Sequence, residues 1–335
     1  MTRSTGTKRR TSSRKQQRAT NSLLIVVAVV ALLVVAGWYI LAQRDGDGEA
    51  AHKHSPAAAA VAHVHGQEVE LPHIHGMGYS DDGEQLVVAA HDGLRVFVGG
   101  EWLIPDVPGN DYMGFSPMDE GFYSSGHPGP DSGLTNPLGL VKSTDAGRTL
   151  TTLGFEGESD FHLMGVGYDN HAIYVLNPTP NSRLGIGLYY SLDDGATWQQ
   201  STLQGRNAQP IQLTVHPDEP NIVGLATEGG LLLSEDYGNQ FDLTSERRPM
   251  TAATFLPSGE ELLFGYQTLQ AFELATGEVR TLGSPELGAN DGIAFLAVNP
   301  ARPDEIALAT FERDIYLSQD GGASWQPIAQ DGKGL

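Results

Sequence analysis

The sequence contains no cysteine. This absence excludes disulfides, thiolate metal ligands and thiol catalysis, so stability must come from a hydrophobic core. Basic residues are scarce beyond residue 22, where 13 Lys and Arg stand against 41 Asp and Glu and the net charge is −28. So acidic a chain repels nucleic acid, and we expect no nucleic-acid partner. Apolar stripes with a helical period are also lacking, and short β-branched and aliphatic runs between Gly, Pro, Asn and Asp indicate an all-β protein.

The N-terminal 42 residues differ from the rest of the chain. Residues 1–22 contain seven basic side chains and no acidic one, and residues 23–42 form an apolar run without a charge. Twenty helical residues span about 30 Å, the thickness of the hydrocarbon core of a bilayer. The residues after the run make a poor signal-peptide cleavage site, and the basic flank is expected to stay inside the cell. We therefore predict a single-pass protein of the cell membrane with its N-terminus cytoplasmic: a basic cytoplasmic tail (1–22), a transmembrane anchor (23–42), a flexible Ala- and His-rich linker (43–70) and an extracytoplasmic domain (71–335).

A short motif recurs along the predicted extracytoplasmic domain. Full or partial copies of S-x-D-x-G-x-[ST]-W start at Ser143, Ser191, Ser234 and Ser318, with gaps of 48, 43 and 84 residues. A period near 42 indicates a repeat architecture, and the double gap predicts one repeat, within residues 250–282, that lacks the motif. One more repeat precedes the first copy. Six units of four strands predict a six-bladed β-propeller, with first strands that start near His73, Asp111, Phe161, Ile211, Thr251 and Ile293.

The motif itself is typical of a structural turn between the third and fourth strands of a unit. Its Asp can accept hydrogen bonds from nearby backbone N–H groups, its Gly can adopt a positive φ, and its Trp can pack against the neighbouring unit. We therefore assign a structural role to these residues: Ser143, Asp145, Gly147, Ser191, Asp193, Gly195, Trp198, Ser234, Asp236, Gly238, Ser318, Asp320, Gly322 and Trp325.

These strings resemble the Asp-box, or BNR-repeat, propellers. The segments HIHGMGYS, DYMGFSPMDEGFYSSGHPGP, NPLGLVKSTDAGRT and GESDFHLMGVGYDNHAIYVLNP are similar to a family of bacterial surface proteins catalogued as glycosyl hydrolases. The chain resembles sialidases, sortilin-type receptors and photosystem assembly factors more distantly. The resemblance implies a propeller and, weakly, a glycoside hydrolase. The chain lacks the Arg-Ile-Pro motif that sialidases carry, and we expect no sialidase activity.

Strand direction predicts which end of the propeller carries the function. In a four-stranded antiparallel unit, the start of the first strand and the turn between the second and third strands lie at one end, the channel mouth, and the repeated motif lies at the other. Five of the eleven histidines map to the mouth and two, His171 and His216, to the opposite end. The residues expected at the mouth are His73, His75, His91, Asp111, His127, Asp160, His162, Arg183, Glu228, Tyr266, Asp291, Glu312 and Arg313.

Three functions fit such a mouth. The first is a binding or assembly module for a glycan or protein ligand, which we expect to be monomeric. The second is glycoside hydrolysis, with Asp111 and Asp160 as the preferred catalytic carboxylates. The third is divalent-metal binding, because the imidazoles of His73 and His75 are spaced to share one face of a strand and suit zinc or copper. The same site can also include His91 or His162 and Asp111.

Overall fold

The computed structural model describes residues 69–130, 132–206 and 208–335, which belong to one compact unit formed by residues 59–335. The predicted cytoplasmic tail, the transmembrane anchor and all but the last two residues of the linker lie outside the described residues. Within the described ranges, no helix is long and apolar enough to cross a membrane.

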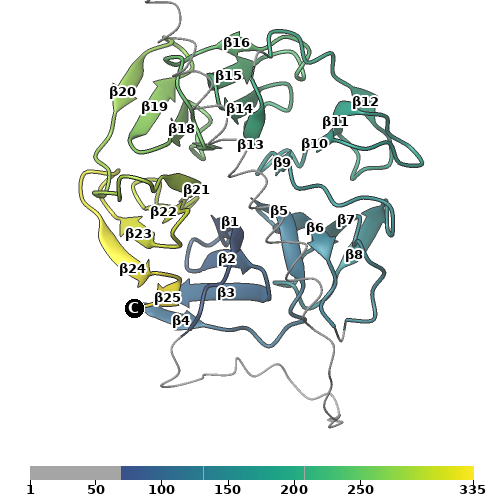
Figure 1. The fold of residues 1–335 in the computed structure, drawn as a ribbon, viewed down its shortest axis with the longest axis horizontal. Coiled ribbons are helices and arrows are strands. Elements are labelled where there is room, and N and C mark those ends of the chain that lie inside the picture. Colours follow the sequence, from purple (N-terminus) through teal and green to yellow (C-terminus); the bar gives the residue numbers. More distant parts are fainter. Residues whose placement is uncertain (1–68, 131, 207) are drawn as a thin grey trace, which may run out of the picture. The chain divides into compact units, whose positions relative to one another are not determined.

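The described chain is a six-bladed β-propeller, as the motif spacing predicts. Six antiparallel sheets surround a central channel, and their first strands lie innermost (Figure 1). Blades 1 to 3 consist of β1 (Ile74–Tyr79), β2 (Leu86–Ala90), β3 (Gly93–Val98) and β4 (Glu101–Leu103); β5 (Asp111–Met118), β6 (Gly121–His127), β7 (Leu140–Ser143) and β8 (Thr151–Gly154); and β9 (Met164–Val166), β10 (Ile173–Asn177), β11 (Gly187–Ser191) and β12 (Gln199–Gln200).

The remaining three blades repeat this order, and the last has a fifth strand. Blades 4 to 6 consist of β13 (Pro210–Val215), β14 (Val223–Thr227), β15 (Gly230–Ser234) and β16 (Asp242–Leu243); β17 (Ala252–Phe255), β18 (Glu261–Gly265), β19 (Leu269–Glu273) and β20 (Val279–Thr281); and β21 (Ile293–Val298), β22 (Ile306–Thr310), β23 (Ile315–Ser318), β24 (Gln326–Gln330) and β25 (Lys333–Gly334).

The predicted starts of the innermost strands agree with the structure to within three residues. The largest difference is in blade 3, where β9 begins at Met164 rather than near Phe161. The N–H of Phe161 donates to the Ser125 hydroxyl of blade 2 at 2.9 Å, so this stretch belongs to the contact between blades instead of the β9–β10 ladder.

The ring closes where the two ends of the described chain meet. Residues 69–71 pair with β25: Leu71 N–H donates to Gly332 O at 2.7 Å, and Gly334 N–H donates to Val69 O at 2.9 Å. The indole N–H of Trp102 in blade 1 donates to Ile328 O in blade 6 at 2.6 Å. Blades 1 and 6 are therefore joined by hydrogen bonds between segments that are more than 220 residues apart in sequence.

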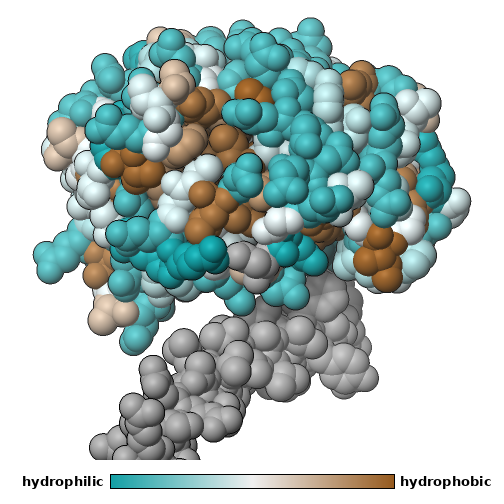
Figure 2. Space-filling model, turned by 90° about the horizontal axis from the view of Figure 1, so that it is seen from above, coloured by the Kyte–Doolittle hydropathy of each residue, from teal (hydrophilic) through white to brown (hydrophobic). Residues whose placement is uncertain are grey.

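The hydrophobic core is divided among the seams between blades. Each of the six clusters of buried side chains in the described residues joins two neighbouring blades. Glycines on the inner strands allow the close approach: a Cβ on Gly78 would lie 2.3 Å from Pro117, and one on Gly165 would lie 2.4 Å from Leu213. The face shown in Figure 2 is mainly hydrophilic, with separate hydrophobic areas, which fits the acidic composition.

The four motif copies fold into the same turn between the third and fourth strands. In the copy that begins at Ser191, the hydroxyl of Ser191 accepts from Gly195 N–H at 2.9 Å, and Asp193 accepts from Thr197 N–H at 2.8 Å. Gly195 has a φ of 76°. Trp198 packs edge-on against Phe155 of blade 2. The turn thus both closes its own blade and locks it to the preceding one.

Blade 5 lacks the motif, as the double gap predicts. A tight turn joins β19 to β20 there, with Gly277 N–H donating to Glu273 O at 2.8 Å. Blade 1 also lacks it, and its turn contains Gly99 and Gly100, both with positive φ.

We predict that Ser191→Ala destabilises the propeller by about 1–3 kcal/mol, because it leaves the buried Gly195 N–H without an acceptor. Ser258→Ala, at an exposed turn position, is the control and should change the free energy of unfolding by less than about 0.5 kcal/mol. Denaturant unfolding measures both. Equal effects of the two substitutions would contradict the structural role of the motif serine.

Candidate functional site

The channel mouth is the end of the ring at which the innermost strands begin. A central cavity of about 340 Å³ runs along these strands and is lined at the mouth by His73, His162, Phe311 and Arg313. Pockets of this size are within the range that small ligands occupy. The repeated turns lie at the other end of the ring, as strand direction predicts.

Three of the predicted mouth residues form one group, here called the Asp111 group: His75, His91 and Asp111. Asp111 begins β5 and is 7% exposed. One carboxylate oxygen lies 3.1 Å from His75 Nε2, and the other lies 2.9 Å from His91 Nδ1. His91 comes from the β2–β3 turn, so two blades supply the three side chains.

A second group of the same composition lies beside it, here called the Asp160 group: His127, Asp160 and His162. Asp160 Oδ2 is 2.6 Å from His162 Nε2 and 3.1 Å from His127 Nε2. Burial alone would raise the pKa of Asp160, but the hydrogen bonds from His127 and His162 outweigh it and lower the pKa to about 2. The hydrogen bond to Asp160 also raises the pKa of His127 to about 9. At neutral pH, Asp160 is ionised and His127 is protonated.

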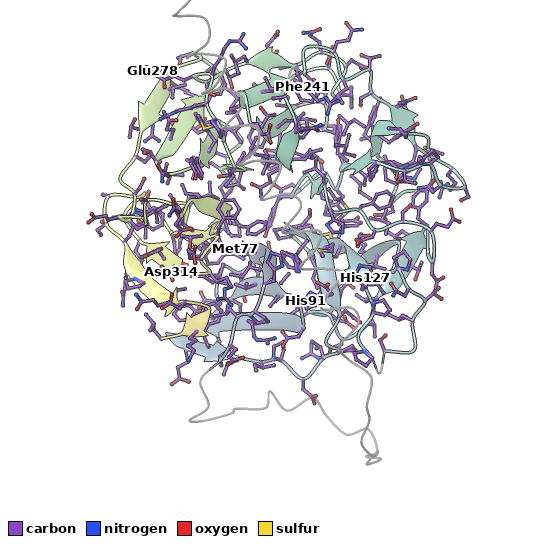
Figure 3. The ribbon with its side chains drawn as sticks, viewed as in Figure 1. Met77, His91, His127, Phe241, Glu278 and Asp314 are labelled. Atoms are coloured by element: carbon purple, nitrogen blue, oxygen red, sulfur yellow. The ribbon has the colours of Figure 1, made fainter. Side chains whose placement is uncertain are left out.

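The two groups meet on blade 2. Asp111 at the start of β5 and His127 at the end of β6 are direct partners in the antiparallel ladder. Figure 3 labels His91 and His127, one from each group. His127 Nδ1 is 2.7 Å from Asn136 Oδ1, which fixes the orientation of this ring. Neighbouring strands therefore place four histidines and two aspartates at one part of the mouth.

His73 lies next to the Asp111 group without being one of its members. It precedes β1, and its ring centroid is 4.6 Å from that of His75. Burial lowers the pKa of His73, and the imidazoles of His75 and His91 contribute to the decrease. The sequence pairs His73 with His75 as metal ligands, whereas the set of described residues whose ligand atoms lie within 4.8 Å of one another is His75, His91 and Asp111.

A backbone irregularity explains this change of partners. The β1–β2 register passes from Ile74↔Ala90 to Gly76↔Ala89, so His75 has no direct partner and occupies a β-bulge. A bulge redirects the side chain of its extra residue. Simple alternation along a strand, on which the pairing of His73 with His75 depends, therefore does not apply here.

The third mouth aspartate, Asp291, lies just before β21 in blade 6. Asp291 is 5% exposed, and its Oδ1 accepts from the backbone N–H groups of Gly292 at 2.8 Å and Glu312 at 3.2 Å. Tyr266 packs against Gly292, where an added Cβ would lie 2.2 Å from the ring. Asp291 thus holds the β22–β23 turn, which presents Glu312 and Arg313.

Two predicted mouth residues, Arg183 and Glu228, do not line the cavity. Arg183 donates to Gly195 O and Ala196 O at 2.9 and 2.7 Å, and its guanidinium lies over the Phe155 ring. It therefore stabilises the seam between blades 2 and 3, a structural role that sequence reasoning missed. Glu228 is exposed in the β14–β15 turn and does not line the cavity.

The two histidines at the opposite end have structural contacts. His216 Nδ1 accepts from the N–H groups of Asp218 and Glu219 at 3.1 and 3.0 Å, and burial lowers its pKa. His171 Nε2 lies 2.6 Å from Asp119. His216 thus stabilises a turn, and His171 contacts a neighbouring carboxylate.

Sequence reasoning missed two apolar residues at the cavity. Phe311 is 54% exposed and Ile211 is 36% exposed, and both line the channel. Phe311 directly precedes Glu312 and Arg313 in a turn that the sequence assigns to the mouth. Strand direction therefore also predicts the position of Phe311, although only polar residues of these turns were considered.

Comparisons with known proteins agree with the fold. The chain is an Asp-box type six-bladed propeller. No protein-family model matches it. It is 25% identical over 225 residues to a probable oligoxyloglucan-reducing end-specific xyloglucanase from Neosartorya fischeri, a match that covers 58% of this chain and 25% of the relative. The chain thus spans about a quarter of the length of that relative.

Two solved structures of GH74 enzymes resemble parts of this chain. A GH74 enzyme from Niastella koreensis superposes with a TM-score of 0.52 at 15% identity, over 77% of this chain and 45% of that one. A GH74 xyloglucanase from Xanthomonas campestris gives a TM-score of 0.48 at 19% identity, over 78% and 46% of the two chains. At such identities the likeness to the Niastella enzyme shows the fold alone.

We predict that the free energy of unfolding decreases between about pH 6.5 and 9, by on the order of 1 kcal/mol after solvent screening. The folded protein keeps a proton on His127 up to about pH 9, whereas the unfolded chain loses it near pH 6.5. Stability from this group is therefore complete below pH 6.5 and is lost as the pH rises. Denaturant unfolding of wild type and His127→Gln across this range isolates the effect; parallel curves would show that the ion pair does not contribute.

Proposed function

We propose that the protein is a binding propeller that takes a carbohydrate ligand at the channel mouth without hydrolysing it. The observation that carries this proposal is the state of the three mouth aspartates. Asp111 lies between two histidines, Asp160 lies between two histidines, and Asp291 accepts two backbone N–H groups. A general acid must present a protonated carboxyl to the leaving group. Asp160, with a pKa of about 2, is ionised at neutral pH and does not fit that role.

The same mouth offers the contacts that sugars use. Phe311 and Ile211 expose apolar surface on which a pyranose ring can stack, and Arg313, His73 and His162 bring hydrogen-bonding groups to the rim of the cavity. Small-ligand sites usually combine apolar surface with a few polar groups that orient the ligand. The name of the Neosartorya relative supports xyloglucan oligosaccharides as the first class to test.

We predict that Phe311→Ala weakens the binding of xyloglucan oligosaccharides at least about tenfold, because the stacking surface is lost. Leu192→Ala is the matched control: Leu192 is 51% exposed, close to Phe311, but follows Ser191 in a repeated turn at the other end of the ring. Isothermal titration calorimetry measures both variants. Equal affinities of Phe311→Ala and wild type, or no uptake of any oligosaccharide by wild type, would contradict the proposal.

Glycoside hydrolysis is the second candidate, favoured by the match to a probable xyloglucanase. It requires release of new reducing ends from xyloglucan by wild type and loss of that release in Asp111→Asn and Asp160→Asn. Under the binding proposal, we expect no release above a heat-treated sample, with oligosaccharide affinity retained. Turnover that both substitutions abolish would replace binding with hydrolysis as the function of the mouth.

A further inference from the structure

The two histidine–aspartate groups at the mouth have equal composition and different internal contacts. In the Asp160 group, Oδ1 of Asp160 is buried without a hydrogen-bond partner, but Oδ2 forms a hydrogen bond of 2.6 Å with His162 Nε2. In the Asp111 group, the nitrogen–oxygen distances of 3.1 and 2.9 Å lack hydrogen-bond alignment, so both oxygens of Asp111 and Nε2 of His75 are buried without a hydrogen-bond partner. The side chains of Asp111 and His75 are 8% and 9% exposed. Buried polar atoms without partners are costly, and such a cluster requires an explanation.

A cation between the three side chains would satisfy all of these atoms. Ligand atoms about 2.1 Å from a tetrahedral ion lie about 3.4 Å apart. His75 Nε2 and His91 Nδ1 lie 3.1 and 2.9 Å from different oxygens of Asp111, and one ligand atom from each of the three residues lies within 4.8 Å of the other two. Closure of the three side chains around an ion would bring these atoms to that spacing.

We propose that His75, His91 and Asp111 bind one divalent first-row transition-metal ion. Two imidazoles and one carboxylate suit zinc, copper and related ions, whereas calcium and magnesium prefer oxygen ligands throughout. The β-bulge of β1 directs His75, and the β2–β3 turn supplies His91. The negative charge of the chain beyond residue 22 favours cation uptake.

The proposed site borders the central cavity. His75 lines that cavity, and three protein ligands leave at least one coordination position for water or a further ligand. Phe311 belongs to a different blade and is not among the three ligands, so the two proposals can be tested separately. Phe311→Ala should therefore leave metal affinity unchanged, and either proposal can fail without the other.

The test is zinc titration of the full chain in which His52, His54, His63 and His65 are replaced by Ala, so that the other His-x-His pairs in the sequence do not contribute. We expect about one zinc ion per chain by calorimetry and, with Co²⁺ as the probe, visible absorption bands that zinc abolishes. Ca²⁺ should not compete. Uptake of clearly less than one ion, or full competition by Ca²⁺, would overturn the proposal.

Two exposed histidines give a matched pair of variants. The side chains of His91 and His162 are 56% and 58% exposed, and each lies beside a mouth aspartate. His91→Ala should weaken zinc binding at least about tenfold, the loss that even outer-shell changes cause at metal sites. His162→Ala should bind zinc as the parent does. Equal affinities of His91→Ala and the parent, or equal losses in the two variants, would overturn the proposal.

Asp111→Asn removes the anionic ligand and should also weaken zinc binding at least tenfold. Because Asp111 is buried, the folding of the Asp111→Asn variant is checked by circular dichroism and thermal unfolding. If this variant does not fold, the comparison of His91→Ala with His162→Ala decides the question, since both substitutions are at exposed positions. His73→Ala should retain zinc, which distinguishes the proposed ligand set from the His73–His75 pair.

Discussion

The hydrogen bonds between residues 69–71 and 332–334 are the constraint on which the other parts of the structure depend. Without closure, blade 1 and blade 6 would each expose a hydrophobic seam, and the channel would have no continuous wall. With closure, the starts of six inner strands come together at one end. The mouth site follows from this geometry, because its side chains come from strand starts and turns that are far apart in sequence.

Scaffold and site use different ends of the same strands. The repeated turns satisfy their own polar groups: serine hydroxyls and aspartates accept backbone N–H groups, and tryptophans fill seams. At the mouth, in contrast, two aspartates are each placed between two histidines, and apolar surface at Phe311 is left exposed. The separation allows the mouth to hold costly buried charge while the turns at the other end hold the blades together.

The fold could be predicted from the sequence because the motif spacing counts the blades directly. A period near 42 residues also identified the blade that lacks the motif. The histidines and aspartates of the mouth could be predicted from strand direction, whereas the apolar Phe311 and Ile211 were missed. The grouping could be predicted only as alternatives, with His91 or His162 and Asp111 beside the His73–His75 pair, because nothing in the local pattern of HIHGMGYS signals the bulge at His75. Arg183 was misplaced because a long side chain in a long loop can reach a seam as easily as the channel.

The histidines of the two mouth groups come from half of the ring, and this has a consequence for how such a protein diversifies. Blades 1 to 3 supply every histidine of the two groups, whereas the corresponding positions of blades 4 to 6 carry Glu228, Tyr266 and Asp291. After duplication of one ancestral blade, each copy could change its two or three mouth residues without disturbing the turns at its far end. Exchange of the residues at the start of a single inner strand between two such propellers would then transfer ligand-binding side chains from one protein to another, one blade at a time.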